Sequence, residues 1–322
     1  MVILTRRIAR LRSNANLSLI LFAVAIAALS IVGSASAEKG RVLGGYRFVP
    51  STRVQDPFIT SYFRNATGLS IASDVDVPIL IIDTDTLLSL SGDLLFVGAS
   101  FEYQHAVGER VAVGITAGGL SRVGTSGESI ISQGVSALFS TDLKSTIELW
   151  RGEDVLLSGL VGLGFGNVLV IDLVQFAEDI INNGPENASI LTMEDGVTVD
   201  GGVAAAWALN HWAGLTALGQ IGYSNIGSQT DELLWRLAAT GTVDFGQNDK
   251  APIGLLLWLD VDRLGPKTIA GGTANAAGIG VFYTGREDLN LGVEIGWSRF
   301  RQLTRDITIN PVNFAITLRY YF

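Results

Sequence analysis

The chain has 322 residues, no cysteine, 38 glycines and a mean hydropathy of +0.38, with only 16% charged residues. The lack of cysteine excludes a disulfide framework, and a formal net charge of −9 disfavours the basic surface that nucleic acid requires. Only one apolar run is long, so most apolar residues are spread over many short segments.

Residues 1–37 have the pattern of a secretory signal peptide. Four arginines precede the apolar run "LSLILFAVAIAALSIVG" at 17–33, and "SASA" follows it, ending at Ala37. A basic start, an apolar middle and small residues before a cleavage site are typical of such a peptide, and we predict cleavage after Ala37. The alternative is an uncleaved N-terminal membrane anchor, because a run of this length nearly spans a bilayer. The mature chain would carry 18 basic and 31 acidic residues, a formal charge of −13.

Residues 38–91 are predicted to contain a first strand and either a plug or an extracellular loop. The strand can be residues 41–49, "RVLGGYRFV", or residues 58–73, "FITSYFRNATGLSIAS". Residues 74–90, "DVDVPILIIDTDTLLSL", bring four aspartates together and could lie at the mouth of a barrel or plug its lumen. Carboxylates at this spacing can bind Ca²⁺, but the EF-hand pattern is missing, so solvated acids are the simpler interpretation and we predict no metal site.

From residue 92 to the end of the chain, apolar residues recur at every second position. In "DLNLGVEIGWSRF", residues 288–300, five apolar side chains alternate with asparagine, glycine, glutamate and serine. A period of two predicts β-strands, and segments of about ten residues suit tilted strands that cross a hydrocarbon layer. Eleven such strands are predicted, at 92–104, 110–121, 134–150, 155–166, 198–209, 213–225, 232–246, 251–263, 276–284, 288–300 and 312–322.

Short and long connectors alternate between these strands. The short ones, rich in Gly, Asn, Asp or charge as hairpin turns require, lie at 105–110, 151–154, 210–212, 246–250 and 285–288. The longer ones lie at 122–133, 167–197, 226–231, 264–275 and 301–311. This pattern predicts an all-β, transmembrane, antiparallel up-and-down β-barrel with short turns on the periplasmic side. Such barrels have an even number of strands, so with one strand from residues 38–91 we predict about twelve, within a range of 10–14.

One long connector contains a segment without strand periodicity. Residues 168–182, "VLVIDLVQFAEDIIN", have apolar residues near helical spacing, which predicts a helix in the longest outer loop. It could fold inward as a constriction or cap the rim of the barrel. Capping is the preferred interpretation, since long outer loops commonly carry some structure.

The chain ends on "NFAITLRYYF", in which every second residue is apolar or aromatic. This pattern resembles the C-terminal signature of bacterial outer-membrane β-barrels, and the residues that carry it are Phe314, Ile316, Leu318, Tyr320 and Phe322. The resemblance is to a class, of porin or transport type, and to no specific family. It implies that the barrel assembly machinery reads this end, and that the protein lies in the bacterial outer membrane among its lipids.

The other face of the predicted strands is polar and mainly acidic. Its charged residues, the candidate lining of the lumen, are Glu102, Asp142, Lys144, Glu148, Asp200, Arg236, Asp244, Asp260, Asp262, Glu294 and Arg319. A pore lined by one sign of charge concentrates ions of the other sign. The sequence therefore predicts a channel for passive or facilitated passage of small solutes, with a preference for cations. The alternative is a closed barrel in which these residues only pair with one another, because twelve strands leave a modest interior.

A soluble β-sandwich or lipocalin-like barrel also alternates, but its polar face would look outward. An outer-membrane lipid hydrolase is a further alternative and needs serine or metal chemistry built on histidine. Only His105 and His211 occur, both in predicted periplasmic turns, and neither a G-x-S-x-G nor an H-E-x-x-H motif is present. We therefore predict no enzyme and no cofactor. A structural or adhesive barrel without an open pore is the third alternative, and the oligomeric state does not follow from the sequence.

Overall fold

The computed structural model describes residues 40–49, 51–82, 85–127, 135–171, 176, 191–225, 232–248, 251–263, 273–302 and 307–322. All of them belong to one unit, residues 36–322. The predicted signal peptide, residues 1–37, lies outside the described residues.

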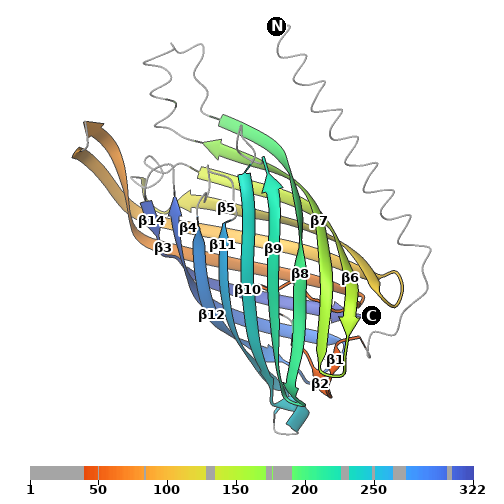
Figure 1. Ribbon diagram of the computed structural model, residues 1–322. Coiled ribbons are helices and arrows are strands. Elements are labelled where there is room, and N and C mark those ends of the chain that lie inside the picture. Colours follow the sequence, from red (N-terminus) through yellow and green to blue (C-terminus); the bar gives the residue numbers. More distant parts are fainter. Residues whose placement is uncertain are drawn as a thin grey trace. The chain divides into compact units, whose positions relative to one another are not determined.

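Twelve antiparallel strands form a closed barrel (Figure 1). They are β3 (Tyr62–Ile82), β4 (Asp85–Ala106), β5 (Val111–Gly124), β6 (Val135–Arg151), β7 (Val155–Ile171), β8 (Leu191–Asn210), β9 (Ala213–Ser224), β10 (Glu232–Asp244), β11 (Ile253–Arg263), β12 (Ala274–Tyr283), β13 (Leu289–Gln302) and β15 (Val312–Tyr321). Each strand pairs with the next, and β15 pairs with β3 from Tyr321 opposite Tyr62 to Val312 opposite Ile71. The predicted fold class and strand number are confirmed. Closure leaves no open strand edge, as a lipid environment demands.

Three smaller elements complete the fold. The two-residue strands β1 (Val42–Leu43) and β2 (Tyr46–Arg47) form a separate hairpin. Strand β14 (Ile307–Ile309) pairs with the end of β13, and the 3₁₀ turn η1 (Gly246–Asn248) lies between β10 and β11. Within the described part of the chain, no helix is long and apolar enough to cross a membrane.

The alternation predicted from the sequence matches the two faces of the barrel wall. In β15 and at Phe322, which follows it, the outward side chains Phe314, Ile316, Leu318, Tyr320 and Phe322 are 37–46% exposed, whereas the inward Thr317 and Arg319 are 3% and 1% exposed. The same alternation recurs in β11 and β13, where leucine, valine and isoleucine point outward and Asp260 and Glu294 are buried. The outer surface is therefore apolar and the interior polar, the reverse of a soluble barrel.

The connectors place the two ends of the barrel. One end, here called the short-turn end, carries the turns between β4 and β5, β6 and β7, β8 and β9, β10 and β11, and β12 and β13, which span two to eight residues. The start of β3 and the end of β15 also lie there. At the other end most connections are longer, but β9 and β10 are joined across residues 225–231, and β3 and β4 across residues 83–84.

The strand bounds exclude three interpretations that the sequence had left open or favoured, two in the N-terminal third and one in the long loop. The twelfth strand is β3, which overlaps the predicted 58–73, so the alternative at 41–49 is wrong. Residues 74–82 and 85–90 belong to the long β3–β4 hairpin (Figure 1) and not to a plug. Val168–Ile171 are the last residues of β7, so a helix cannot begin at 168. Apart from Phe176, the remainder of the predicted helix, 172–182, lies outside the described residues.

Candidate functional site

The lumen at the short-turn end is occupied by residues 40–49 and 51–61, here called the N-terminal segment. It begins with the β1–β2 hairpin, whose turn needs Gly44 and Gly45, both at positive φ (53° and 79°). The Gly44 N–H donates to the Glu153 carbonyl in the β6–β7 turn at 2.9 Å. Arg47 pairs with Glu287 in the β12–β13 turn at 3.0 Å. The hairpin is thus fixed to the turns at the rim of the barrel.

A layer of apolar side chains joins the N-terminal segment, including its hairpin, to the barrel wall. It consists of Leu43, Tyr46, Phe48 and Phe58 from the segment, and Leu156, Ala206 and Ala208 from β7 and β8. The Tyr46 and Phe48 rings meet edge to face with their centroids 4.7 Å apart. The Tyr46 hydroxyl donates to Thr242 Oγ1 at 2.7 Å. Burial raises the pKa of Tyr46 well above its ordinary value, so this hydroxyl stays protonated.

The wall makes room for this layer with glycine. An added Cβ at Gly214 in β9 would lie 2.5 Å from Tyr46 Cε1 and 2.8 Å from Phe48 Cε1. Any larger residue would therefore collide with both rings. Inward glycines such as Gly214 allow the N-terminal segment to pack closely against the barrel wall.

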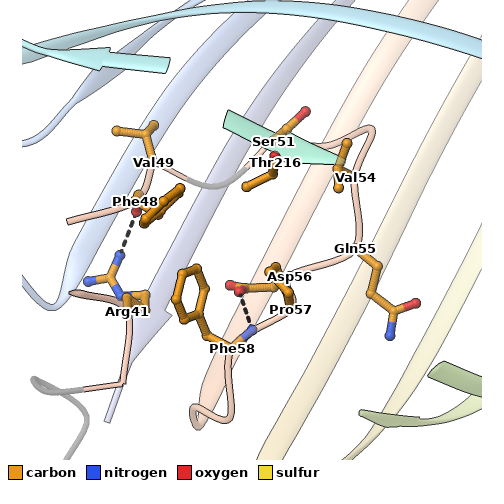
Figure 2. A pocket seen from close by; sticks show the side chains of 10 residues that line it. All are labelled: Arg41, Phe48, Val49, Ser51, Val54, Gln55, Asp56, Pro57, Phe58 and Thr216. Carbon is orange, nitrogen blue, oxygen red and sulfur yellow. Dashed lines mark hydrogen bonds between the residues drawn. The ribbon is translucent and has the colours of Figure 1, made fainter. Parts of the chain in front are cut away.

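The segment then turns back on itself, as Figure 2 shows. Between Arg41, Phe48, Asp56 and Phe58 it encloses a cavity of about 10 Å³, room for about one water molecule. The Arg41 side chain donates to the Phe48 carbonyl, and the Phe58 N–H donates to Asp56 Oδ1 at 3.1 Å. Because the loop is packed on itself as well as on the wall, it fills the lumen there rather than only narrowing it.

A buried ion pair joins the segment to the seam where the barrel closes. Arg319 Nη1 in β15 lies 2.7 Å from Asp56 Oδ2, and the two side chains are 1% and 4% exposed. The Arg319 guanidinium also lies 4.4 Å from the ring centroid of Tyr62, the first residue of β3. Removing one partner of such a pair leaves a buried charge without compensation, which costs about 3–5 kcal/mol.

Wall side chains also satisfy the backbone of the segment. Gln104 Nε2 in β4 donates to the carbonyls of Phe58 and Thr60 at 3.1 and 3.0 Å. Ser158 Oγ in β7 donates to the Pro57 carbonyl at 2.6 Å. The hydrogen bonds from these wall side chains take the place of the interstrand backbone hydrogen bonds that a buried extended chain would otherwise need.

Four of the predicted lining residues contact the N-terminal segment or pair with a predicted lining residue that does. Arg319 pairs with Asp56. Glu294 accepts hydrogen bonds from the N–H and hydroxyl of Thr52, at 3.1 and 2.8 Å. Arg236 forms a bidentate pair with Asp260, at 3.1 and 2.6 Å, and donates to the Arg53 carbonyl at 2.7 Å. A fifth predicted lining residue, Glu102, pairs within the wall: it accepts from the Tyr62 hydroxyl at 2.9 Å and pairs with Arg64 at 2.5 Å, both in β3.

The other predicted lining residues lie in three places. Asp244 accepts from the Gly246 N–H, Gln247 and Thr284 at the short-turn end, and Glu148 pairs there with Arg151 at 3.2 Å. Asp142 and Asp200 reach over β7 from both sides, where Gly164 and Gly162 leave space for their carboxylates, and Lys144 interacts electrostatically with both. Asp262 lies next along β11 from Asp260 and interacts with it and with Arg236.

Sequence reasoning missed the cations that face these acids. Arg41, Arg47 and Arg53 of the N-terminal segment, and Arg64 of β3, lie against the inner wall or its rim. The signal was present in the composition, since residues 40–61 contain three arginines and one aspartate in an otherwise acidic mature chain. At this level the interior is therefore more balanced in charge than the strands alone predict.

The two histidines lie apart. His105 is close to the end of β4, not in the turn, and its Nδ1 is 3.4 Å from Ser61 Oγ. His211 lies in the β8–β9 turn. Among the described residues, no group of three or more His, Asp or Glu side chains is placed to hold a metal ion.

No protein-family model and no curated protein matches the chain. Three solved structures to which it is similar are the KdgM porin in complex with disordered oligogalacturonate (7% identity, TM-score 0.46, 81% of this chain and 99% of that chain), the translocator domain of the autotransporter NalP from Neisseria meningitidis (12%, 0.49, 82% and 89%) and LpxR from Salmonella typhimurium (12%, 0.44, 80% and 100%). The neighbours belong to the class of bacterial outer-membrane β-barrels that the C-terminal pattern resembles. At these identities and TM-scores the likeness concerns the strand arrangement and carries no argument about function.

Proposed function

We propose that the protein is an outer-membrane β-barrel channel for small solutes, closed at its short-turn end by the N-terminal segment. The observation that carries the proposal is the pairing of an apolar outer face with a polar inner wall. The barrel holds the segment mainly by side-chain contacts, with single backbone hydrogen bonds at Gly44 and Ser61, and not by a strand ladder. A segment held in this way can leave without breaking any hydrogen-bond ladder between the barrel strands.

The proposal includes location and orientation. After removal of the signal peptide, the outward apolar residues contact the lipids of the outer membrane. The short turns, and the hairpin fixed to them, face the periplasm, as in barrels with short periplasmic turns. Cation preference belongs to the same proposal. The acidic side chains of the wall outnumber its basic ones, and release of the N-terminal segment would also remove that segment's three arginines from the lumen.

Conductance in a planar bilayer tests the proposal. The wild type is compared with a variant that lacks residues 41–57, which keeps the signal peptide cleavage site and all of β3. We expect few openings in the wild type, steady conductance in the deletion, and a reversal potential in a KCl gradient that favours K⁺. A folded deletion variant without conductance would support instead a structural barrel without a pore, the candidate that the close filling of the lumen favours. Anion preference would contradict the cation part alone.

A further inference from the structure

Arg53 occupies a site of unusual composition on the inner wall. Its guanidinium carbon lies 4.5 Å from the ring centroid of Trp258 in β11, within the range of a cation–π contact. Three carboxylates, Asp260, Asp262 and Glu294, attract the same guanidinium electrostatically. Trp258 and these three acids are here called the cation cage.

The wall is shaped to hold the indole of Trp258 flat. Gly278 in β12 pairs with Trp258 in the register and with Gly296 in β13. A Cβ at either glycine would lie 2.5 Å from Trp258 Cζ2. The indole therefore extends across the backbone of two neighbouring strands, and Trp258 is only 1% exposed. Its position is fixed by the barrel and does not depend on Arg53.

The occupant is less well fixed than the cage. The Thr52 N–H donates a hydrogen bond to Glu294, and the Arg236 guanidinium donates to both Asp260 and the Arg53 carbonyl. The Arg53 side chain itself is only half-buried. The occupant is thus held through its backbone neighbours more firmly than through its own head group.

The charge count of the site selects for a cation. Around the Arg53 head, three carboxylates face one other guanidinium, that of Arg236, so the site without Arg53 carries a formal charge of −2. A flat aromatic face beside carboxylates suits a planar, weakly hydrated cation better than a small metal ion with a strong hydration shell. A guanidinium satisfies both features, because it stacks on the ring and donates in the plane to carboxylates.

We propose that the cation cage is a binding site for small organic cations with a guanidinium head, and that Arg53 is its internal occupant in the closed state. The proposal rests on the proposed channel for its role, since it names the class of solute that the lumen would take. The binding itself does not depend on conductance. A solute of this class would compete with Arg53 and so favour the release of the N-terminal segment.

The experiment uses the full-length mature protein in detergent micelles, with methylguanidinium chloride as the probe and sodium chloride at equal ionic strength as the reference. Arg53→Ala empties the cage, and Arg47→Ala, which removes an arginine of the same segment at the rim, is the matched control. Binding is followed by tryptophan fluorescence, with Arg53→Ala/Trp258→Phe identifying the responding indole. Arg53→Met, which keeps the length of the apolar stem, replaces Arg53→Ala if that variant does not fold.

We expect a saturable, methylguanidinium-specific change in Arg53→Ala that disappears in the double variant. In the wild type and in Arg47→Ala, binding is expected to be about tenfold weaker, because tethered Arg53 competes as an intramolecular ligand. The proposal is overturned if a folded Arg53 variant gives no saturable change, if sodium gives the same change, or if Trp258→Phe leaves the response intact. Binding without conductance would leave the site standing and refute the channel, and conductance without binding would do the reverse.

Discussion

Replacing Asp56 by asparagine removes the negative charge that faces Arg319 inside the barrel. The pair is 2.7 Å apart and both side chains are almost fully buried, so Arg319 would keep a buried charge without its counter-ion. Removing one partner of such a pair costs about 3–5 kcal/mol. Asp56 lies in the N-terminal segment and Arg319 in the wall, so this cost weighs against the docked segment. At 1.36 kcal/mol per factor of ten, the released population would rise by about 160- to 5,000-fold.

Limited proteolysis with trypsin measures this population. Cleavage after Arg53 yields a fragment that begins at Val54, which mass spectrometry identifies. When opening and closing are faster than cleavage, the cleavage rate follows the fraction of molecules with the segment released. Asp288→Asn is the matched control, since Arg286 and Asp288 are 2.6 Å apart but both exposed, and exposed pairs contribute little. Equal cleavage rates in Asp56→Asn and wild type, or a similar rise in Asp288→Asn, would refute the reasoning.

Two further substitutions test the inner and outer faces of the wall. Gly214→Ala forces a Cβ against Tyr46 at 2.5 Å. It should weaken docking of the segment by about 1–3 kcal/mol through overpacking, which trypsin would report as faster cleavage after Arg53. The control Gly219→Ala lies on the outer face of the same strand, where its Cβ meets nothing closer than 3.6 Å, and should leave the cleavage rate unchanged. Ile316→Lys places a charge on the outer face, where Ile316 is 46% exposed, and should cost about 2–4 kcal/mol if that position lies near the bilayer midplane. Urea titration of the barrel in lipid vesicles measures this cost, and an unchanged midpoint would contradict a lipid-facing position.

The barrel wall was predictable because each strand meets two different environments. Lipid-facing and inward positions alternate, so a period of two appears in the sequence wherever a strand crosses. The prediction failed where this period is interrupted. In β3 the register shifts between Ala72 and Val75, and Asp74 has a φ of 54°. Such a bulge changes the face that later residues occupy, so residues 74–90 did not read as strand.

A plug within residues 38–91 was raised from the sequence, but its bounds and its contacts were not predictable, for a different reason. Its contacts join residues far apart in the chain, since Tyr46 and Thr242 are 196 positions apart, and Asp56 and Arg319 are 263 apart. The described residues 48–49 and 51–61 have no strand or helix of their own and so no period to detect. The acids of the wall were found from the alternation, but their partners were not, because charge complementarity between distant segments leaves no local pattern.

The position of Arg319 explains why the segment and the closed barrel depend on each other. Its guanidinium lies between Tyr62 of β3 and Asp56 of the segment, at the seam where β15 meets β3. An unpaired arginine on the inner face of the last strand would oppose closure, because a buried charge requires a counter-charge. Asp56 supplies it only when the segment lies in the lumen. Docking of the segment therefore stabilises the seam, and a closed seam completes the site that holds Asp56.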